Sequence, residues 1–168
     1  EQMMAQDVKV LVIAPADSKA LVPVCKKATD AGIVVVNIDN KFDAAALEDK
    51  KIRIPFVGPD NRKGAKLGGD YLATKLAKGD SVAIVEGVPN AFNGVQRKLG
   101  FEDAMNAAGM KIASSQSANW MPDQAEKVVA GMLVQNPDLK ALLCANDNMA
   151  LGAVAALKYQ MWRLERAA

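Results

Sequence analysis

Histidine is absent from the 168 residues of this chain, and cysteine is scarce. Because histidine is the commonest general base of enzymes and the commonest metal ligand, the most frequent routes to catalysis and to metal binding are missing. The two cysteines, Cys25 and Cys144, are too few for a structural zinc site, which needs about four ligands. We therefore expect no metal site. We interpret both cysteines as small core residues and leave a disulfide between them open.

Other absences narrow the class of protein further. Neither G-x-G-x-x-G nor the Walker pattern occurs at the turns Ala14–Asp17 and Gly87–Asn90, which speaks against a nucleotide-using enzyme. No apolar run approaches the ~20 residues that a membrane-spanning helix needs. The net charge is only +2, and the basic residues are scattered among acidic ones. We therefore expect no nucleic-acid partner, no cofactor and no catalytic residue.

Aliphatic residues are abundant and occur in short runs. Apolar residues make up 51% of the chain, whereas aromatic residues make up 5%. Strand-like runs cover residues 8–14, 33–38, 52–57, 81–85, 111–117 and 141–146, and helical patterns lie between them. Residues 40–51 read as a polar loop, and Pro55 places its run at a sheet edge or a strand end. The alternation predicts an α/β fold with parallel, doubly wound sheets.

Polar side chains gather where these strands end. In open α/β sheets, ligands bind at the carboxyl ends of the strands. Carboxylates and amides bind hydroxyl groups, and an aromatic face covers the apolar surface of a sugar ring. The alternative is that Asp and Asn in these places form turns and helix caps. The residues concerned are Asp17, Asp39, Asn40, Asn93, Asn119, Trp120, Asn146 and Asp147.

Three larger side chains near these strand ends have two interpretations each. Trp120 stands between Asn119 and a helix start instead of on an apolar stripe, which favours stacking on a ligand over a place in the core. Arg97 either reaches back to a pocket or lies in solvent. Phe92 is either a hydrophobic staple of the following helix or part of a pocket wall.

The segment Asn146-Asp-Asn-Met-Ala-Leu-Gly-Ala153 resembles the N-D-x-M-A-x-G-A signature of periplasmic sugar-binding proteins of the ribose-binding type. The resemblance extends from about residue 8 to residue 158. Its other pieces are Ile13–Asp17, Val36–Asp39, Gly58–Asn61, Gly64–Tyr71 and Gln96–Phe101.

The resemblance implies that Asp39 and Asn146 bind sugar hydroxyls and that Trp120 stacks on the ring. With Asn40, Asn93 and Arg97, these residues form the predicted ligand-binding set. Two positions depart from the ribose-specific pattern, which has an arginine at Asn40 and another near Val95. The identity of the sugar is therefore left open.

The resemblance also implies two lobes. Residues 1–59 match part of lobe one, residues 60–158 match part of lobe two, and the tail 159–168 does not match the family. A crossing between two sheets is expected near Gly58–Asn61. The sequence is thus interpreted as a truncated or partial chain. Its strand 8–14 should then be an open apolar edge, covered by self-association, by the Trp162-containing tail or by other parts of the parent protein.

The implied function is sugar binding for a bacterial ABC transporter. The ligand would be a monosaccharide or polyol, the partner a membrane permease, and the location the periplasm, with no chemical transformation. The alternative is the effector-binding core of a lactose-repressor-type regulator, which shares the fold and a similar N-D-x-x-A-x-G segment. Met149 favours the transport proteins over the regulator.

Overall fold

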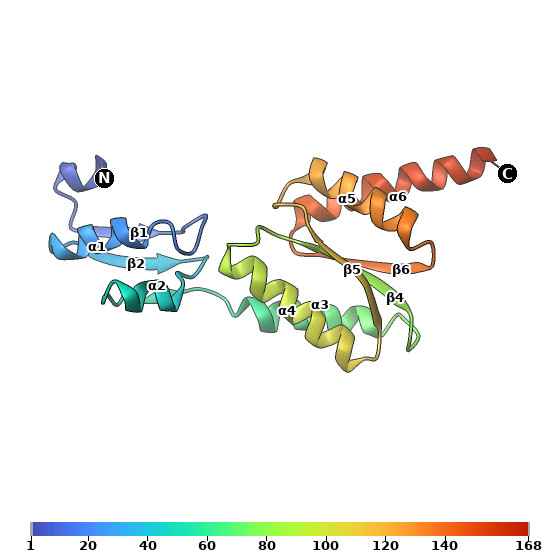
Figure 1. The fold of residues 1–168 in the computed structure, drawn as a ribbon, viewed down its shortest axis with the longest axis horizontal. Helices are drawn as coiled ribbons and strands as arrows, with labels where there is room; N and C mark the ends of the chain where they lie inside the picture. Colours follow the sequence, from blue (N-terminus) through green and yellow to red (C-terminus); the bar gives the residue numbers. More distant parts are fainter. Residues whose placement is uncertain (1, 168) are drawn as a thin grey trace. The chain divides into compact units, whose positions relative to one another are not determined.

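Two compact units make up the chain (Figure 1). The computed structural model describes the backbone of residues 2–167 and the side chains of residues 2–161. The first unit comprises the residues up to Asp60 together with Asn90–Asn93, and the second comprises Asn61–Pro89 together with the residues from Gly94 onward. Each unit has its own three-stranded sheet, with all strands parallel. The predicted α/β fold and the predicted crossing between two sheets near Gly58–Asn61 are confirmed.

The first unit is built around the strand order β1-β2-β3. Its elements are the 3-10 helix η1 (Gln2–Gln6), β1 (Val10–Ile13), α1 (Val22–Asp30), β2 (Val34–Ile38), α2 (Ala44–Asp49) and β3 (Phe56–Val57). Helix α1 buries Val22, Cys25 and Ala28, which pack with Val35 of β2 in one core cluster. Pro55 directly precedes the two-residue edge strand β3, as the sequence predicts.

Two local details of this unit differ from the sequence prediction. The stretch expected to be a polar loop contains helix α2, because the Asp43 carboxylate caps it by accepting a hydrogen bond of 2.8 Å from Ala46 N. The sequence also predicts that Asp17 or Ser18 caps the helix after β1, but helix α1 begins at Val22. The Asp17 carboxylate accepts from the backbone N–H groups of Lys19 and Ala20, so it closes a turn before the helix instead of capping the helix itself.

The second unit has helices on both faces of its sheet, whose strand order is β5-β4-β6. Helices α3 and α4 lie on one side of the sheet, and α5 and α6 on the other (Figure 1). The strands are β4 (Ser81–Glu86), β5 (Lys111–Ser117) and β6 (Leu139–Cys144), and the helices are α3 (Asn61–Ala73), α4 (Phe92–Ala107), α5 (Pro122–Gln135) and α6 (Asp147–Ala167). Central strand β4 is buried from Ser81 to Val85, as expected for a parallel strand covered on both faces.

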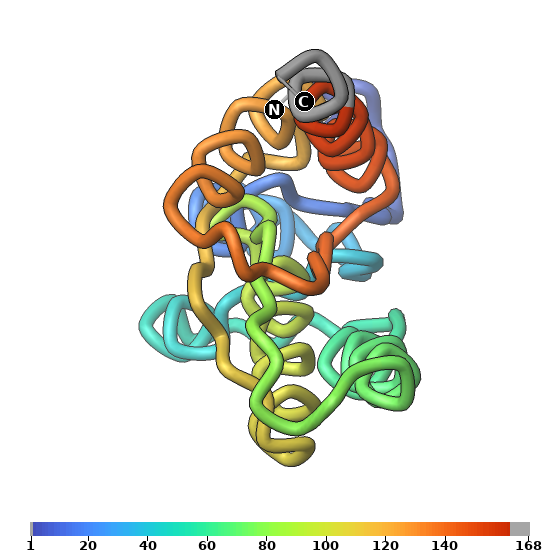
Figure 2. The backbone as a smooth tube through the Cα atoms, turned by 90° about the vertical axis from the view of Figure 1, so that its right-hand side faces the viewer, coloured from blue at the N-terminus to red at the C-terminus, as the bar shows by residue number. Residues whose placement is uncertain are grey.

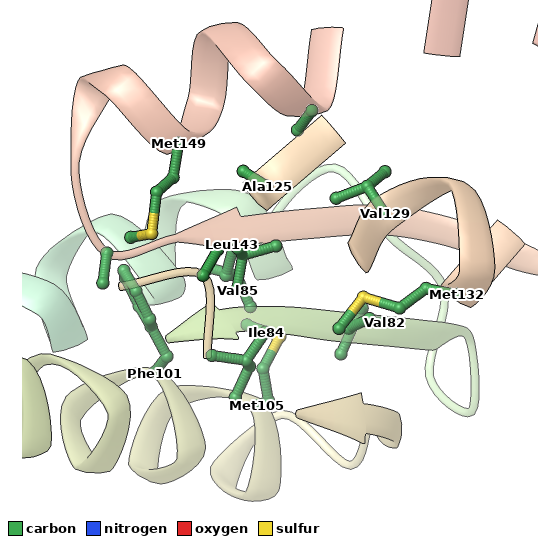
Figure 3. Close-up of a cluster of buried hydrophobic side chains, with 14 of the residues drawn as sticks. Val82, Ile84, Val85, Phe101, Met105, Ala125, Val129, Met132, Leu143 and Met149 are labelled. Carbon is green, nitrogen blue, oxygen red and sulfur yellow. The ribbon is translucent and has the colours of Figure 1, made fainter. Parts of the chain in front are cut away.

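The core of the second unit lies on both sides of β4 (Figure 3). Met105 and Phe101 of α4 pack below the strand, and Val129 and Met132 of α5 pack above it. Helices α5 and α6 run side by side (Figures 1 and 2), and Met149 at the start of α6 is fully buried. This packing fixes the carboxyl ends of β4, β5 and β6 relative to one another.

Both sheets have open apolar edges in the part of the chain that the structure describes. Val10, Val12 and Val34 share one face of the first sheet and are 53%, 62% and 57% exposed. The prediction that β1 is an open apolar edge is therefore confirmed. In the second unit, β6 is an edge strand, and an apolar groove of about 240 Å³ runs between it and α6.

The sequence predicts that a tail unlike the family begins at residue 159. Helix α6 continues without a break past this residue. The Trp162 side chain, suggested as a cover for the open edge, lies outside the described residues. No helix in the described part of the chain combines the length and apolar character needed to cross a bilayer.

Candidate functional site

The carboxyl ends of the three strands in the second unit meet at one edge, which carries one group of the predicted site residues. Gly87 follows β4, Trp120 lies three residues after β5, and Asn146 lies two residues after β6. Parallel strands place these positions together because all of their carboxyl ends point the same way. The structure therefore brings together two of the predicted ligand contacts, Trp120 and Asn146.

Trp120 is held in an unusual backbone conformation. Its φ is +67°, and that of Asn119 is +51°, in the left-handed region that L-residues with large side chains rarely adopt. Such conformations persist only where the surroundings enforce them, and they cluster at functional sites. The indole ring lies against Gly87 and Gly94, since a Cβ on Gly87 would overlap the ring and one on Gly94 would lie 3.1 Å from it. Trp120 is half-buried and packs against the core cluster of the second unit.

Asn146 links the strand edge to the helix that follows. Its Oδ1 accepts a 2.9 Å hydrogen bond from Met149 N, which caps the first turn of α6. Its Nδ2 lies 3.4 Å from the Trp120 carbonyl oxygen, a long hydrogen bond that leaves the second N–H of the amide for another acceptor. The cap interpretation and the ligand interpretation of Asn146 are thus compatible.

Arg97, on the second turn of α4, lies beside Trp120 and Asn146 in the second unit. Its Nε donates to Asn61 Oδ1 at 2.9 Å, and its Nη1 donates to the Ala145 carbonyl oxygen at 2.7 Å. The guanidinium carbon lies 5.6 Å from the centroid of the Trp120 ring, within cation–π range. Arg97 is therefore not free in solvent.

A second group of predicted site residues lies in the first unit, at the end of β2. Asp39 has a φ of +57° and is exposed. No hydrogen bond or ion pair within the described residues engages its carboxylate. A carboxylate in this state has all of its acceptor positions available for hydroxyl groups.

Asn40 and Asn93 lie next to Asp39 in the same unit. Asn40 is 3% exposed. Its Nδ2 donates to Pro15 O at 2.8 Å, and its Oδ1 accepts from Asn93 N at 3.0 Å and, at 3.5 Å, from Ser18 Oγ. These contacts fix the turn after β2. By contrast, Asn93 Oδ1 is buried and has no hydrogen-bond partner in the described part of the chain. A buried acceptor of this kind costs about 1–3 kcal/mol unless something donates to it.

Asn37 is a site-building residue that the sequence reasoning missed. It is 1% exposed; its Nδ2 donates to the carbonyl oxygens of Ile13, Ile38 and Asn40, and its Oδ1 accepts from Phe42 N. This network holds the chain on both sides of Asp39 in its left-handed turn. The available signal was an amide among the β-branched residues of a strand, at an inward-facing position. Buried amides of this kind need partners and therefore organise the backbone around them.

The six predicted residues divide between the two units. Arg97, Trp120 and Asn146 come together in the second unit, whereas Asp39, Asn40 and Asn93 come together in the first. The prediction that Asp39, Trp120 and Asn146 converge on one cleft remains a prediction. The Lys41 ammonium group lies over the Phe92 ring, 5.8 Å from the ring centroid. This contact is compatible with Phe92 as a helix staple and with Phe92 as part of a pocket wall.

Two titratable side chains, Asp17 and Cys144, have shifted pKa values with different causes. Backbone hydrogen bonds from Lys19 and Ala20, with a further one from Asn90, lower the pKa of the Asp17 carboxyl below its ordinary value. Burial raises the pKa of the Cys144 thiol to about 11, which suits an inert core position. The described residues contain no group of three or more acidic or cysteine side chains that could hold a metal ion.

Comparison with known protein families decides the class of this fold. The family model of the periplasmic binding protein domain matches residues 1–161. The chain belongs to this family. The resemblance seen in the Asn146–Ala153 segment is thereby confirmed, and the family is one of binding proteins.

Characterised relatives within the family are named for sugars. The chain is 63% identical to a D-ribose/D-allose-binding protein of Pseudomonas aeruginosa over 94% of its length. It is 34% identical to the D-allose-binding periplasmic protein of Escherichia coli, again over 94%. It spans about half of these relatives, covering 50% and 51% of their lengths.

Solved structures give the same picture of the fold. An ABC transporter solute-binding protein from Burkholderia multivorans is 58% identical, with a TM-score of 0.93, and the match covers 95% of this chain and 56% of that one. A periplasmic solute-binding protein from Actinobacillus succinogenes with bound D-allose is 40% identical, with a TM-score of 0.88, covering 95% and 57%. The strand and helix arrangement described above is therefore that of solute-binding proteins.

Proposed function

We propose that this chain is the sugar-binding component, or a part of it, of a bacterial ABC importer. The observation that carries the proposal is the half-buried Trp120 next to Asn146 at one sheet edge, where the Asn146 amide donates to the Trp120 carbonyl oxygen. An aromatic face next to hydrogen-bonding groups fits a molecule with apolar C–H faces and hydroxyl edges. The ligand class is a monosaccharide or polyol, and the 63% identical relative is named for ribose and allose.

The proposed contacts follow from the state of each side chain. Trp120 stacks on the ring, and the Asn146 amide donates to a hydroxyl through its remaining N–H. The exposed Asp39 carboxylate accepts from hydroxyl groups, and Asn93 Oδ1 accepts from a hydroxyl or a bridging water. Asn40 supports these contacts, because its amide already bonds to Pro15, Ser18 and Asn93.

In this proposal the two units correspond to parts of two lobes of one binding protein. The residues up to Asp60 and Asn90–Asn93 supply part of the first lobe, and the second unit supplies part of the second. Residues 159–167 extend α6. The protein works in the periplasm, binds its sugar without making or breaking a covalent bond, and delivers it to a membrane permease. Ligand contacts from both lobes would favour a closed state over an open one.

The choice between sugars depends on positions that differ from the ribose-specific pattern. Asn40 and Val95 replace two arginines of that pattern, and an amide and an aliphatic side chain offer fewer donors than two guanidinium groups. Both D-ribose and D-allose are therefore included in the test, together with other pentoses, hexoses and polyols.

Proton–nitrogen correlation spectra of the 168-residue chain, recorded with each sugar at millimolar concentration, test the proposal. We expect D-allose or D-ribose to shift the Trp120 indole N–H and the Asn146 side-chain amide. Trp120→Ala should weaken binding, seen as smaller shifts of the Asn146 amide at the same sugar concentration. Asp39→Asn should weaken binding about tenfold or more, because a hydrogen bond to a charged group is worth about 1.5–3 kcal/mol. Asp49→Asn, an exposed carboxylate on α2, is the matched control. If no sugar in the panel shifts these signals, the proposal is wrong.

A further inference from the structure

The side chain of Arg97 joins three separate segments of the second unit. Its Nε bonds to Asn61 at the start of α3, its Nη1 bonds to the carbonyl oxygen of Ala145 directly before Asn146, and its guanidinium group lies over the Trp120 ring. Asn61 is 8% exposed, so its acceptor lies in a largely water-free position. Charge-assisted hydrogen bonds at 2.7–2.9 Å are short and strong, and two of them to different segments fix the orientation of the planar group.

The Trp120 ring needs such support because its backbone is strained. Positive φ values at Asn119 and Trp120 cost of order 1–3 kcal/mol each. Gly87 and Gly94 lie against the ring but have no side chain to hold it. Trp120 packs against the core cluster of the second unit, and Arg97 in addition links the ring to the end of β6 and the start of α3.

We propose that Arg97 is a positioning residue, which sets the Trp120 ring and the Ala145–Asn146 segment for the ligand and acts on sugar binding through them. This role differs from a direct hydrogen bond between Arg97 and a sugar hydroxyl. The inference rests on the proposed function only where it concerns sugar affinity. The placing of the ring itself is a property of the ligand-free chain.

Fluorescence of the ligand-free chain tests the placing of the ring. Trp162→Phe leaves Trp120 as the single tryptophan, because the chain has two. In this background, Arg97→Met removes the cation and both hydrogen bonds. We expect Trp120 emission to shift to longer wavelength and its quenching by acrylamide to increase. Arg97→Lys retains a cation near the ring and should give intermediate values.

Lys98→Met is the matched control, since Lys98 is the next residue of the same helix and pairs with Glu86 and Glu102 instead. Circular dichroism reports whether each variant folds. If Arg97→Met does not fold, Arg97→Lys and Asn61→Ala are compared with the parent by the same quenching measurement. Emission and quenching equal to those of the Lys98→Met control in the folded Arg97 variants would overturn the inference.

A double-mutant cycle tests the effect on sugar affinity, with D-allose as the probe. Arg97→Met alone should weaken binding about tenfold, the size of a lost partly buried cation–π contact, and Arg97→Lys should weaken it less. In a Trp120→Ala background Arg97→Met should have little further effect, because Arg97 acts through the ring. Additive losses would show a direct contact with the sugar and would refute the positioning role. If the parent chain binds no sugar, the proposed function fails, and the quenching result alone decides the role of Arg97.

Discussion

Single residues at the strand ends adopt backbone conformations that their side chains disfavour. Asp39, Asn119 and Trp120 all have positive φ, and each lies one to three residues after the end of a strand. A network of buried amides and glycines holds these residues, with Asn37 around Asp39 and Gly87 behind Trp120. These backbone conformations lower the stability of the chain locally and are offset by the surrounding contacts. Strained conformations of this kind cluster at binding sites.

Asp17 gives a prediction about pH. Its carboxyl pKa is lowered, so the folded chain binds the proton less tightly than the unfolded chain does. The stability that this group contributes is therefore present above its unfolded pKa and lost as the pH falls through its folded pKa. We expect Asp17→Asn to lower the free energy of unfolding at pH 7 and to have little effect at pH 2. Urea unfolding at both pH values measures this, with Glu48→Gln on α2 as control. An equal effect at both pH values would contradict the prediction.

At the scale of elements, close packing between neighbouring helices decides which residues the chain tolerates. Helix α3 has a low content of large apolar residues and approaches α4 through Gly69, whose missing Cβ leaves room for Ala104. Gly68, the next residue on the same helix, has nothing within 4 Å of its would-be Cβ. Two adjacent glycines of one helix thus have opposite roles.

Alanine substitutions distinguish these two glycines. Gly68→Ala should raise the free energy of unfolding by about 0.5–1 kcal/mol, because alanine costs less backbone entropy in a helix. Gly69→Ala should lower it by about 1–3 kcal/mol, since its Cβ would lie 2.6 Å from that of Ala104. Urea unfolding of the two variants beside the parent provides the measurement. Equal effects of the same sign would refute the packing argument.

The open edge at β1 gives a second prediction at this scale. The exposed face formed by Val10, Val12 and Val34 adjoins a groove of about 770 Å³ between η1, β1 and α1. Exposed apolar strands at sheet edges favour pairing with other chains. We expect the chain to self-associate as its concentration rises and Val12→Lys to reduce this, with Lys63→Gln, on α3 of the other unit, as control. Sedimentation velocity over a range of concentrations is the measurement. A parent chain that stays monomeric throughout would rule out self-association by this edge.

On the scale of the whole molecule, length and binding are connected. The chain spans about half of the relatives that it matches. A sugar held by groups from only part of such a site loses a large share of its contacts and of its shielding from water. We therefore expect the 168-residue chain to bind sugar weakly, with a dissociation constant in the millimolar range.

Calorimetry of the purified chain against pentoses, hexoses and polyols checks this expectation, with sedimentation to establish the oligomeric state. Micromolar or tighter binding by a monomeric chain would show that these residues form a complete site, contrary to the prediction. Trp120→Ala is the matched variant, because it removes the proposed stacking contact. Heat that is released by the parent chain but not by this variant comes from sugar binding at the proposed site.

Most of the fold was predictable from the sequence because its signals are local. Runs of β-branched and aliphatic residues mark β2 and β4, and Gly109 and Pro122 lie at the helix boundaries that they predict. Helix α2 was missed, because six residues rich in alanine between polar neighbours carry no amphipathic pattern. It forms because Asp43 caps it and the adjacent Phe42 is buried, and burial depends on the rest of the unit.

The sequence by itself determined the fold class, the family and the candidate residues Trp120 and Asn146, because strand ends and a short signature can be read from consecutive residues. Only the tertiary structure decided what surrounds them. The contacts of Arg97 with Asn61, Ala145 and Trp120 join residues 23 to 48 positions away, and Asn37 bonds to Ile13 across two strands. Hydrogen bonds and ring contacts over such separations arise from packing in space, which no local pattern in the chain encodes.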